Sequence, residues 1–276
     1  MGRWLLALGA SFGTPAIIRF TGTVHRFLLR PEECQGDLLR LQGAEAHHAA
    51  VVLRVRPGEA ASVLDGVGSE FRGIVESVSK SAVQIRVRER IQHPARATEL
   101  HLVVALLKGR AWDTVLEKAT ELGVTSIQPL AAERCVVRLS APEALEKLAG
   151  WRATTISAAK QCGTPWLPRL GAPLTPAEWL RQKSDTGLQI IAALEANRGT
   201  IRQAVTHFAV TRGGPPEQVA LIIGPEGDFT GAEYAAFRAA GVIPISLGPF
   251  VLRADTAVVA ALAIAAAELS ELHGNR

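Results

Sequence analysis

The sequence has few cysteines, and their spacing excludes the usual metal and dithiol motifs. Only three occur in 276 residues, at positions 34, 135 and 162, and none forms a C-x-x-C pair. The adjacent His47 and His48 would point to different faces of a helix, so they are poorly placed to share a metal ion. We therefore expect a reduced intracellular protein without a metal site.

The sequence also lacks a long uninterrupted apolar run. The longest stretch in its last predicted helix, Ala257 to Ala267, stops at Glu268. A transmembrane helix needs about 20 predominantly apolar residues. We therefore expect no membrane association.

Residues 1–19 are predicted to be a short disordered extension or to result from a misassigned start. Two features resemble targeting signals: Trp4 to Ala10 follow Arg3, and no acidic residue precedes Glu32. We favour the extension and a cytoplasmic location, with organellar targeting as the alternative.

The composition is that of a globular protein with an uneven charge distribution. Apolar residues make up 48% of the chain and the mean hydropathy is +0.18, which allows a large core and two domains. Residues 1–98 hold 13 of the 30 Lys and Arg but 9 of the 26 Asp and Glu, leaving 17 of each sign afterwards. A basic amino-terminal segment indicates a module that binds phosphate, with a solvated arginine-rich surface as the alternative.

The amino-terminal part reads as a small β-barrel. Short apolar segments separated by turn residues predict strands at 61–64, 71–78 and 82–87, and one helix at 44–54 ends in the turn Val55-Arg56-Pro57-Gly58. His93 to Arg96 has the composition of a linker. We expect domains at 20–92 and 99–276.

The carboxyl-terminal part alternates buried strands with helices, which is typical of a parallel α/β sheet. Predicted strands cover residues 100–107, 126–130, 188–194, 219–223 and 242–247. The pairs Ser140/Glu143 and Thr230/Glu233 are capping boxes that open helices. Asp255 or Thr256 is expected to cap a final alanine-rich helix whose small residues allow close contact with another element.

Two similar bends follow buried strands in the last quarter of the chain. The first is Gly224-Pro225-Glu226-Gly227-Asp228-Phe229, and the second is Leu247-Gly248-Pro249-Phe250. Glycine lets the backbone approach a ligand closely, and helix amino termini follow each bend. This pattern predicts a cofactor pocket. A dinucleotide enzyme is disfavoured because G-x-G-x-x-G is missing after Ile223.

Six blocks in a fixed order resemble the RsmE family of the SPOUT superfamily over roughly residues 20 to 272. They are His48 to Arg54, Glu117 to Val124, Glu133-Arg134-Cys135, Gln161-Cys162-Gly163, Gly224 to Gly227, and Leu247-Gly248-Pro249 with Val251-Leu252-Arg253. One such turn alone is unspecific, whereas six in order are hard to obtain by coincidence.

The resemblance implies a fold, a reaction and partners. It implies an amino-terminal PUA-like RNA-binding barrel and a carboxyl-terminal α/β domain with a deep trefoil knot. It further implies S-adenosylmethionine as cofactor, methylation of uridine N3 in small-subunit ribosomal RNA, and a homodimer. The alanines of the last helix suit a subunit contact, although packing within one subunit explains them equally well.

The matching positions also suggest site residues. Arg253 is the candidate for stabilising the uracil, with a structural ion pair to Asp255 or Glu226 as the alternative. Glu226 could accept a bond from a ribose hydroxyl or cap its turn, and Thr256 could contact cofactor or cap its helix. The expected cofactor contacts are Leu194, Glu195, Gly224, Glu226, Gly227, Leu247, Gly248, Leu252 and Thr256. The expected RNA contacts are Arg54, Arg56, Lys108, Arg110 and Arg134.

The chain departs from the family pattern near the expected substrate. Asp228 stands where the family has a second glycine, Phe250 where it has arginine, and Ala254-Asp255 where it has Thr-Glu. The family's Glu-Gln-x-Gly-Arg is Lys160-Gln161-Cys162-Gly163-Thr164 here, where Lys160 offers a local replacement charge. A noncatalytic RNA-binding or ribosome-assembly factor is therefore the alternative to an enzyme.

Overall fold

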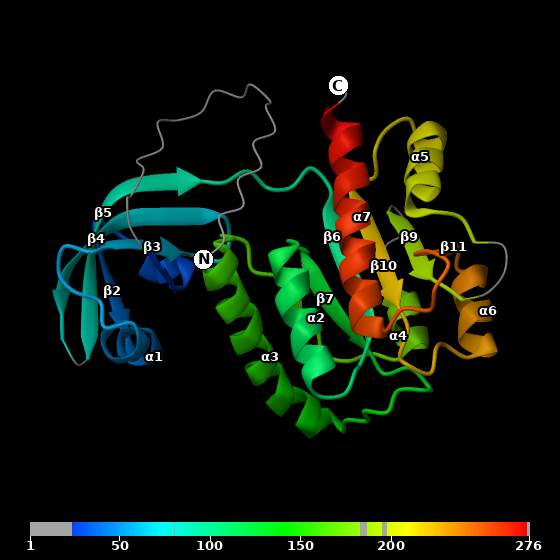
Figure 1. Ribbon diagram of the computed structural model, residues 1–276, viewed down its shortest axis with the longest axis horizontal. Coiled ribbons are helices and arrows are strands. Elements are labelled where there is room, and N and C mark those ends of the chain that lie inside the picture. The colour runs from blue at the N-terminus through cyan, green and yellow to red at the C-terminus, as the bar shows by residue number, and fades with distance from the viewer. Residues whose placement is uncertain (1–23, 80, 183–186, 195–197, 275–276) are drawn as a thin grey trace.

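A computed structural model describes residues 24–79, 81–182, 187–194 and 198–274. The predicted extension at 1–19 lies outside these residues. The chain forms two sheets (Figure 1), which define an amino-terminal unit, residues 24–92, and a carboxyl-terminal unit, residues 99–274.

The amino-terminal unit is built on a five-stranded sheet of order β1-β3-β4-β5-β2. Its strands are β1 His25–Leu28, β2 Leu38–Gln42, β3 Ala60–Leu64, β4 Ser69–Val78 and β5 Ala82–Gln92. The pairing of β1 with β3 is parallel and the other pairings are antiparallel. Leu39 and Leu41 of β2 are fully buried while their neighbours are exposed. This alternation is expected because successive side chains of a strand point to opposite faces, and only one face of this strand is covered.

The helix predicted at 44–54 is shorter than expected. The α-helical part, α1, spans Gly43–His47 and continues as a π-helical turn, η2, over His48–Val52. A short 3-10 helix, η1, covers Pro31–Glu33. Arg54 then adopts a left-handed φ of 54°, and the helix cannot continue through it because a right-handed helix requires a negative φ.

The carboxyl-terminal unit has a six-stranded, entirely parallel sheet of order β11-β9-β10-β6-β7-β8. Its strands are β6 Glu99–Ala105, β7 Ser126–Leu130, β8 Arg169–Leu170, β9 Leu188–Ala192, β10 Gln218–Ile223 and β11 Ile243–Ile245. The predicted mixed α/β fold with a parallel sheet is thereby confirmed.

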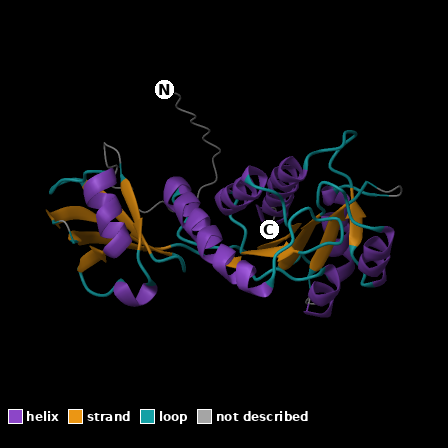
Figure 2. Ribbon diagram, turned by 90° about the horizontal axis from the view of Figure 1, so that it is seen from below, coloured by secondary structure: helices purple, strands orange, loops and turns teal. Residues whose placement is uncertain are grey.

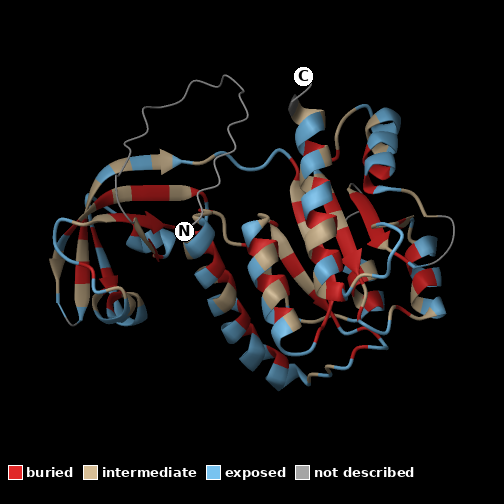
Figure 3. Ribbon diagram, viewed as in Figure 1, coloured by how far each residue is buried: buried red, intermediate tan, exposed pale blue. Residues whose placement is uncertain are grey.

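Helices cover both faces of this sheet (Figures 1 and 2). On one face α3, α2, α7 and α5 pack side by side, and on the other α4 packs with α6. The helices are α2 Arg110–Glu121, α3 Ala141–Cys162, α4 Pro176–Gln182, α5 Ile201–Arg212, α6 Gly231–Ala239 and α7 Ala254–Gly274. Coverage on two faces explains why the central strands are nearly continuous apolar runs; Figure 3 shows them as the buried centre.

Side-chain caps fix where several helices begin. The predicted capping boxes at Ser140/Glu143 and Thr230/Glu233 are both present, and a third joins Thr200 to Gln203. Helix α7 begins at Ala254, before either of its expected caps, Asp255 and Thr256. The Arg253 carbonyl accepts the first helical bond, from the Ala257 amide, at 2.8 Å.

The expectation that no segment is long enough to span a membrane is wrong for helix α7. Residues Ala254–His273 have a mean hydropathy of 1.4 and are long and apolar enough to cross a bilayer by composition alone. In the structure the helix is part of the core: Val258, Leu262 and Leu269 are at most 4% exposed against the sheet and neighbouring helices. Ala257, Ala261 and Ala265 are buried within the same chain.

Candidate functional site

The main candidate site lies where the central strands end. The segments after β9, β10 and β11 meet there and surround an open cavity of about 300 Å³. In open parallel sheets this carboxyl edge is the general place for ligands. Both glycine-and-proline bends line the same cavity, as the sequence predicted.

Three hydrogen bonds of Asp228 stabilise the first bend. The Asp228 amide donates to the Pro225 carbonyl at 2.9 Å, and the Asp228 carboxylate accepts from the Phe229 amide at 2.8 Å and from the Tyr234 hydroxyl at 2.7 Å. A Cβ on Gly224 would lie 3.1 Å from the Phe229 ring. Phe229 is 2% exposed, so it leaves little room there for a side chain.

The second bend presents an open backbone and apolar side chains. The Ser246 hydroxyl donates to the Gly248 carbonyl at 3.1 Å and accepts from its amide at 3.2 Å. Gly248 has a φ of 132°, which side chains rarely tolerate. Phe250 and Val251 line the cavity while remaining 81% and 75% exposed. Phe250 therefore flanks the opening without closing it.

Besides Asp228, three charged side chains line the cavity. Arg253 is 80% exposed, and its Nε lies 3.6 Å from the Asp255 carboxylate, a weak surface pair that leaves the guanidinium accessible. Arg198 donates to the Ala193 carbonyl at the end of β9. Glu226 adds an exposed carboxylate on the first bend. The site thus combines apolar walls with both charge signs.

Most of the expected cofactor residues lie on the cavity wall. The lining includes Leu194, Gly224, Glu226, Leu247, Gly248 and Leu252, together with Arg253. Gly227 is outside the lining because it faces Arg134, whose guanidinium donates to the Gly227 carbonyl at 3.1 Å. Thr256 is exposed in the first turn of α7 and also lies outside the lining. Glu195 falls outside the described residues.

The basic residues expected to contact RNA occupy two places. Lys108 and Arg110 follow β6 and Arg134 follows β7, so all three are exposed on the carboxyl edge that carries the cavity. Arg54 and Arg56 are exposed in the amino-terminal unit, at the end of η2. Lys160 does not line the cavity; it pairs with Glu45 of the amino-terminal unit.

Several cavity residues were not identified from the sequence. Arg198 precedes α5 without a recognisable motif, although the Thr200/Gln203 capping box next to it marks the start of that helix. In the sequence, Phe250 was noted only as a departure from the family pattern and Val251 only as part of a matching block. Neither was expected on the cavity wall, because no local pattern shows that an exposed loop lines a cavity. Their placement depends on contacts between distant segments.

The described residues contain no group of three or more His, Cys, Asp or Glu side chains able to hold a metal. The three cysteines are free thiols. Burial raises the pKa of Cys34 to about 11 and also raises the pKa of Cys135. Raised pKa values make both thiols poor nucleophiles.

Family models match both units of the chain. Residues 94–266 match an RNA methyltransferase domain and residues 41–88 match an RNA methyltransferase PUA domain. A Synechocystis relative named ribosomal RNA small subunit methyltransferase E is 32% identical over 87% of this chain and 76% of its own length. The chain belongs to the RsmE family of RNA methyltransferases.

Other RsmE relatives and solved structures agree. The Mycobacterium tuberculosis protein of the same name is 32% identical over 82% of this chain and 85% of its own. A methyltransferase from Legionella pneumophila, solved with the cofactor SAM, superimposes with a TM-score of 0.80 at 33% identity, covering 89% of this chain and 98% of that one. The Neisseria gonorrhoeae RsmE, bound to S-adenosyl methionine, superimposes with a TM-score of 0.77 at 29% identity, covering 88% of this chain and 96% of that one. The predicted family and its PUA-like domain are thereby confirmed.

Proposed function

We propose that this chain methylates N3 of a uridine in small-subunit ribosomal RNA, with S-adenosylmethionine as methyl donor. The observation that supports this most strongly is that two separate bends line one cavity at the carboxyl edge of the sheet. Relatives with the same architecture were solved with this cofactor. Membership of an RNA methyltransferase family sets the reaction class.

The cavity fits the proposed cofactor in size and chemistry. Its volume of about 300 Å³ lies at the lower end for small-molecule sites, and its open side leaves further room. Leu247, Leu252 and Ile223 would hold the adenine, while backbone groups of both bends would supply its hydrogen bonds. Glu226 would accept a bond from a ribose hydroxyl. When bound, this cofactor supplies a methyl group activated on a sulfonium.

Arg253 is the proposed catalytic residue. Uridine N3 becomes nucleophilic when it loses its proton, which leaves negative charge on the uracil oxygens. The exposed Arg253 guanidinium on the cavity border would stabilise that charge. Holding the base close to the donor would supply much of the remaining acceleration. The chain need form no covalent intermediate.

RNA would contact both units through exposed basic side chains. Lys108, Arg110 and Arg134 surround the carboxyl edge, and Arg54 with Arg56 extends the contact to the PUA-like unit. Phosphate contacts of this kind position RNA, whereas the cavity selects an unstacked base. We infer that the PUA-like domain spans residues 20–92 and the methyltransferase domain residues 99–276.

We also infer a cytoplasmic homodimer with a trefoil knot at the cofactor loops, as the family resemblance implies. Support for the dimer comes from Phe250 and Val251, two largely exposed apolar side chains next to the cavity. Exposed neighbouring apolar residues of this kind are typical of contact surfaces. A second subunit over them would also shield the cofactor site from solvent.

The direct test is nucleoside analysis after methylation of unmodified small ribosomal subunits. The purified chain with labelled S-adenosylmethionine should produce 3-methyluridine in ribosomal RNA. Arg253→Ala should lower the rate about 100-fold or more, while Arg212→Ala, a matched exposed arginine on α5, should leave it unchanged. Label in another nucleoside, or equal rates for both variants, would reject the assigned chemistry.

A further inference from the structure

The two units meet at the carboxyl end of α3. In Figures 1 and 2, α3 lies between the first sheet and the remaining helices. The last turn of α3 and residues 163–167 contact β1, α1 and the loop between β3 and β4. We call these contacts the inter-unit joint.

An ion pair forms the first part of the joint. The Lys160 ammonium lies 2.7 Å from the Glu45 carboxylate, with side chains only 17% and 22% exposed. The other Glu45 oxygen accepts from the Leu28 amide of β1 at 3.3 Å. A partly buried pair resists separation because either partner alone would be left uncompensated.

Backbone pairing forms the second part. The Gly68 amide donates to the Pro165 carbonyl, and the Leu167 amide donates to the Gly66 carbonyl, both at 3.0 Å. Val67 and Trp166 thereby form an antiparallel bridge between the units. Paired backbone bonds fix both distance and direction, which single side-chain contacts do not.

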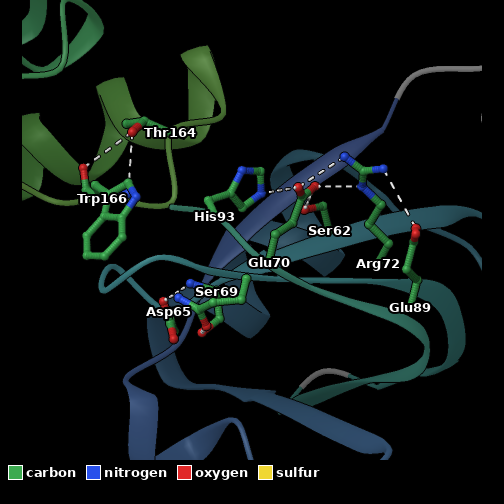
Figure 4. A network of polar contacts seen from close by, with 10 residues as sticks. Ser62, Asp65, Ser69, Glu70, Arg72, Glu89, His93, Thr164 and Trp166 are labelled. Atoms are coloured by element: carbon green, nitrogen blue, oxygen red, sulfur yellow. Dashed lines mark hydrogen bonds and ion pairs between the residues drawn. The ribbon is translucent and has the colours of Figure 1, made fainter. Parts of the chain in front are cut away.

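Close packing forms the third part. A Cβ on Gly68 would lie 2.3 Å from the Trp166 ring, and one on Gly163 would lie 2.9 Å from the Arg26 guanidinium. Arg26 also donates to the Gln161 carbonyl at 3.3 Å, at the negative end of α3. Figure 4 draws Trp166 and Thr164 beside the polar network of the first sheet.

The ion pair is connected to the turn that carries Arg54 and Arg56, which we call the Arg54 corner and which is proposed to contact RNA. Glu45 lies in α1, which continues into η2 and ends at Arg54. Bonds from the Leu53 amide to the His48 carbonyl, 2.9 Å, and from the Val55 amide to the Ala49 carbonyl, 3.0 Å, hold this corner to the helix. The orientation of α1 therefore sets the orientation of the corner.

We propose that Lys160 and Glu45 are positioning residues that hold the Arg54 corner at a fixed orientation to the methyl-transfer cavity, so that one RNA engages both. The pairing with Glu45 thus makes Lys160 a contact between the units rather than a charge for the substrate. The expected effect on RNA binding rests on the proposed function, whereas the orientation of the two units relative to each other does not.

The test combines a distance measurement with kinetics on the full chain. Spin labels at Ser81→Cys and Ala239→Cys, in a Cys162→Ser background, report the distance between the units. Lys160→Glu should broaden this distribution and raise KM for ribosomal RNA about fivefold or more, with kcat and the Kd for S-adenosylmethionine within about twofold. Lys147→Glu makes the same charge change on an exposed position of α3 and should alter neither.

The exchanged variant Lys160→Glu with Glu45→Lys should recover a narrow distribution and a KM within about threefold of the original, since Leu28 still loses its acceptor. An unchanged distance distribution in Lys160→Glu would show that the Lys160–Glu45 pair does not hold the two units in place, and would overturn the proposal. A broadened distribution with an unchanged KM would overturn its positioning role. If the original chain methylates no ribosomal RNA, the proposed function fails, while the distances still decide whether the Lys160–Glu45 pair holds the units in place.

Discussion

Asp228 shows how an aspartate can occupy a backbone conformation that usually favours glycine. Its φ is 60°, in the left-handed region that disfavours most side chains. Aspartate tolerates this region better than most residues because its side chain bonds locally. Here the carboxylate accepts from the Phe229 amide and the Tyr234 hydroxyl. These bonds therefore stabilise the shape of the first bend.

Replacing Asp228 should separate strain from hydrogen bonding. Asp228→Ala keeps the unfavourable backbone and loses both bonds, so we expect it to lower the free energy of unfolding by about 1–2 kcal/mol. Asp228→Gly loses the same bonds but relieves the strain, so it should be about 1 kcal/mol more stable than the alanine variant. Urea unfolding of the two variants measures this difference. Equal stability of both would contradict the backbone argument.

Glu70 links the stability of the first sheet to pH. Burial raises its pKa, but hydrogen bonds from Arg72, Ser62 and His93 outweigh burial and hold the pKa below its ordinary value of about 4.3 (Figure 4). A lowered pKa in the folded state stabilises the protein above pH of about 4.3, and this stability is lost as the pH falls through the folded pKa.

We therefore expect Glu70→Gln to remove part of the acid sensitivity of the chain. Thermal unfolding between pH 3 and pH 6 should show a shallower dependence for this variant than for the original. Glu32→Gln, at an acid whose pair with Arg30 is largely exposed and contributes little, should keep the original slope. Parallel curves for Glu70→Gln and the original chain would count against this role of the network.

The element that ends at Arg54 and Arg56 is the predicted RNA-contacting corner of the PUA-like unit. Both side chains are exposed, and the left-handed backbone at Arg54 turns the chain away from the axis of the preceding helix. Strained backbone of this kind is often found at functional positions. The corner also follows the family block that begins at His48.

Changing both arginines to alanine should weaken RNA binding and reduce its salt dependence. Each phosphate contact contributes about 0.7 to the slope of log K against log salt for single-stranded regions, so the slope should fall by about 1.4. Arg181→Ala with Arg212→Ala removes two exposed arginines from the other unit as a control. Fluorescence anisotropy at several salt concentrations measures the slopes. A slope equal to the control would exclude the corner from the interface.

The strong local patterns were sufficient to predict much of the fold. The buried runs of β6, β7, β9 and β10 and two capping boxes were visible in the sequence because each depends on nearby residues. Strands β1, β2 and β8 and helix α5 were not predicted. Strand β8 has two residues and β1 four, too few for a periodic signal, and their structure depends on distant partners.

At the scale of the whole molecule, contacts between remote segments complete the site. The two bends could be predicted as a pocket because both follow buried parallel strands. The pairing of Lys160 with Glu45 could not, since 115 residues separate them and a charged residue at either position is otherwise ordinary. Arg198 escaped prediction because its place on the cavity wall depends on the segments after β10 and β11, which are distant in sequence.

The proposed dimer gives a prediction at this scale. Light scattering should show twice the chain mass of 29.4 kDa. Val251→Asp should give a monomer because it places a charge in the apolar contact. Val210→Asp, at a residue 78% exposed on α5, should remain dimeric. A monomeric original chain would refute the dimer without affecting the cavity.

The measurement that tests the central claim most directly is calorimetric titration of the full chain with S-adenosylmethionine. The cavity between the two bends should bind one molecule per chain in a saturable manner. Circular dichroism of the same sample would establish that the chain is folded. Saturable binding is the result expected from this site; no binding by the folded chain would contradict it.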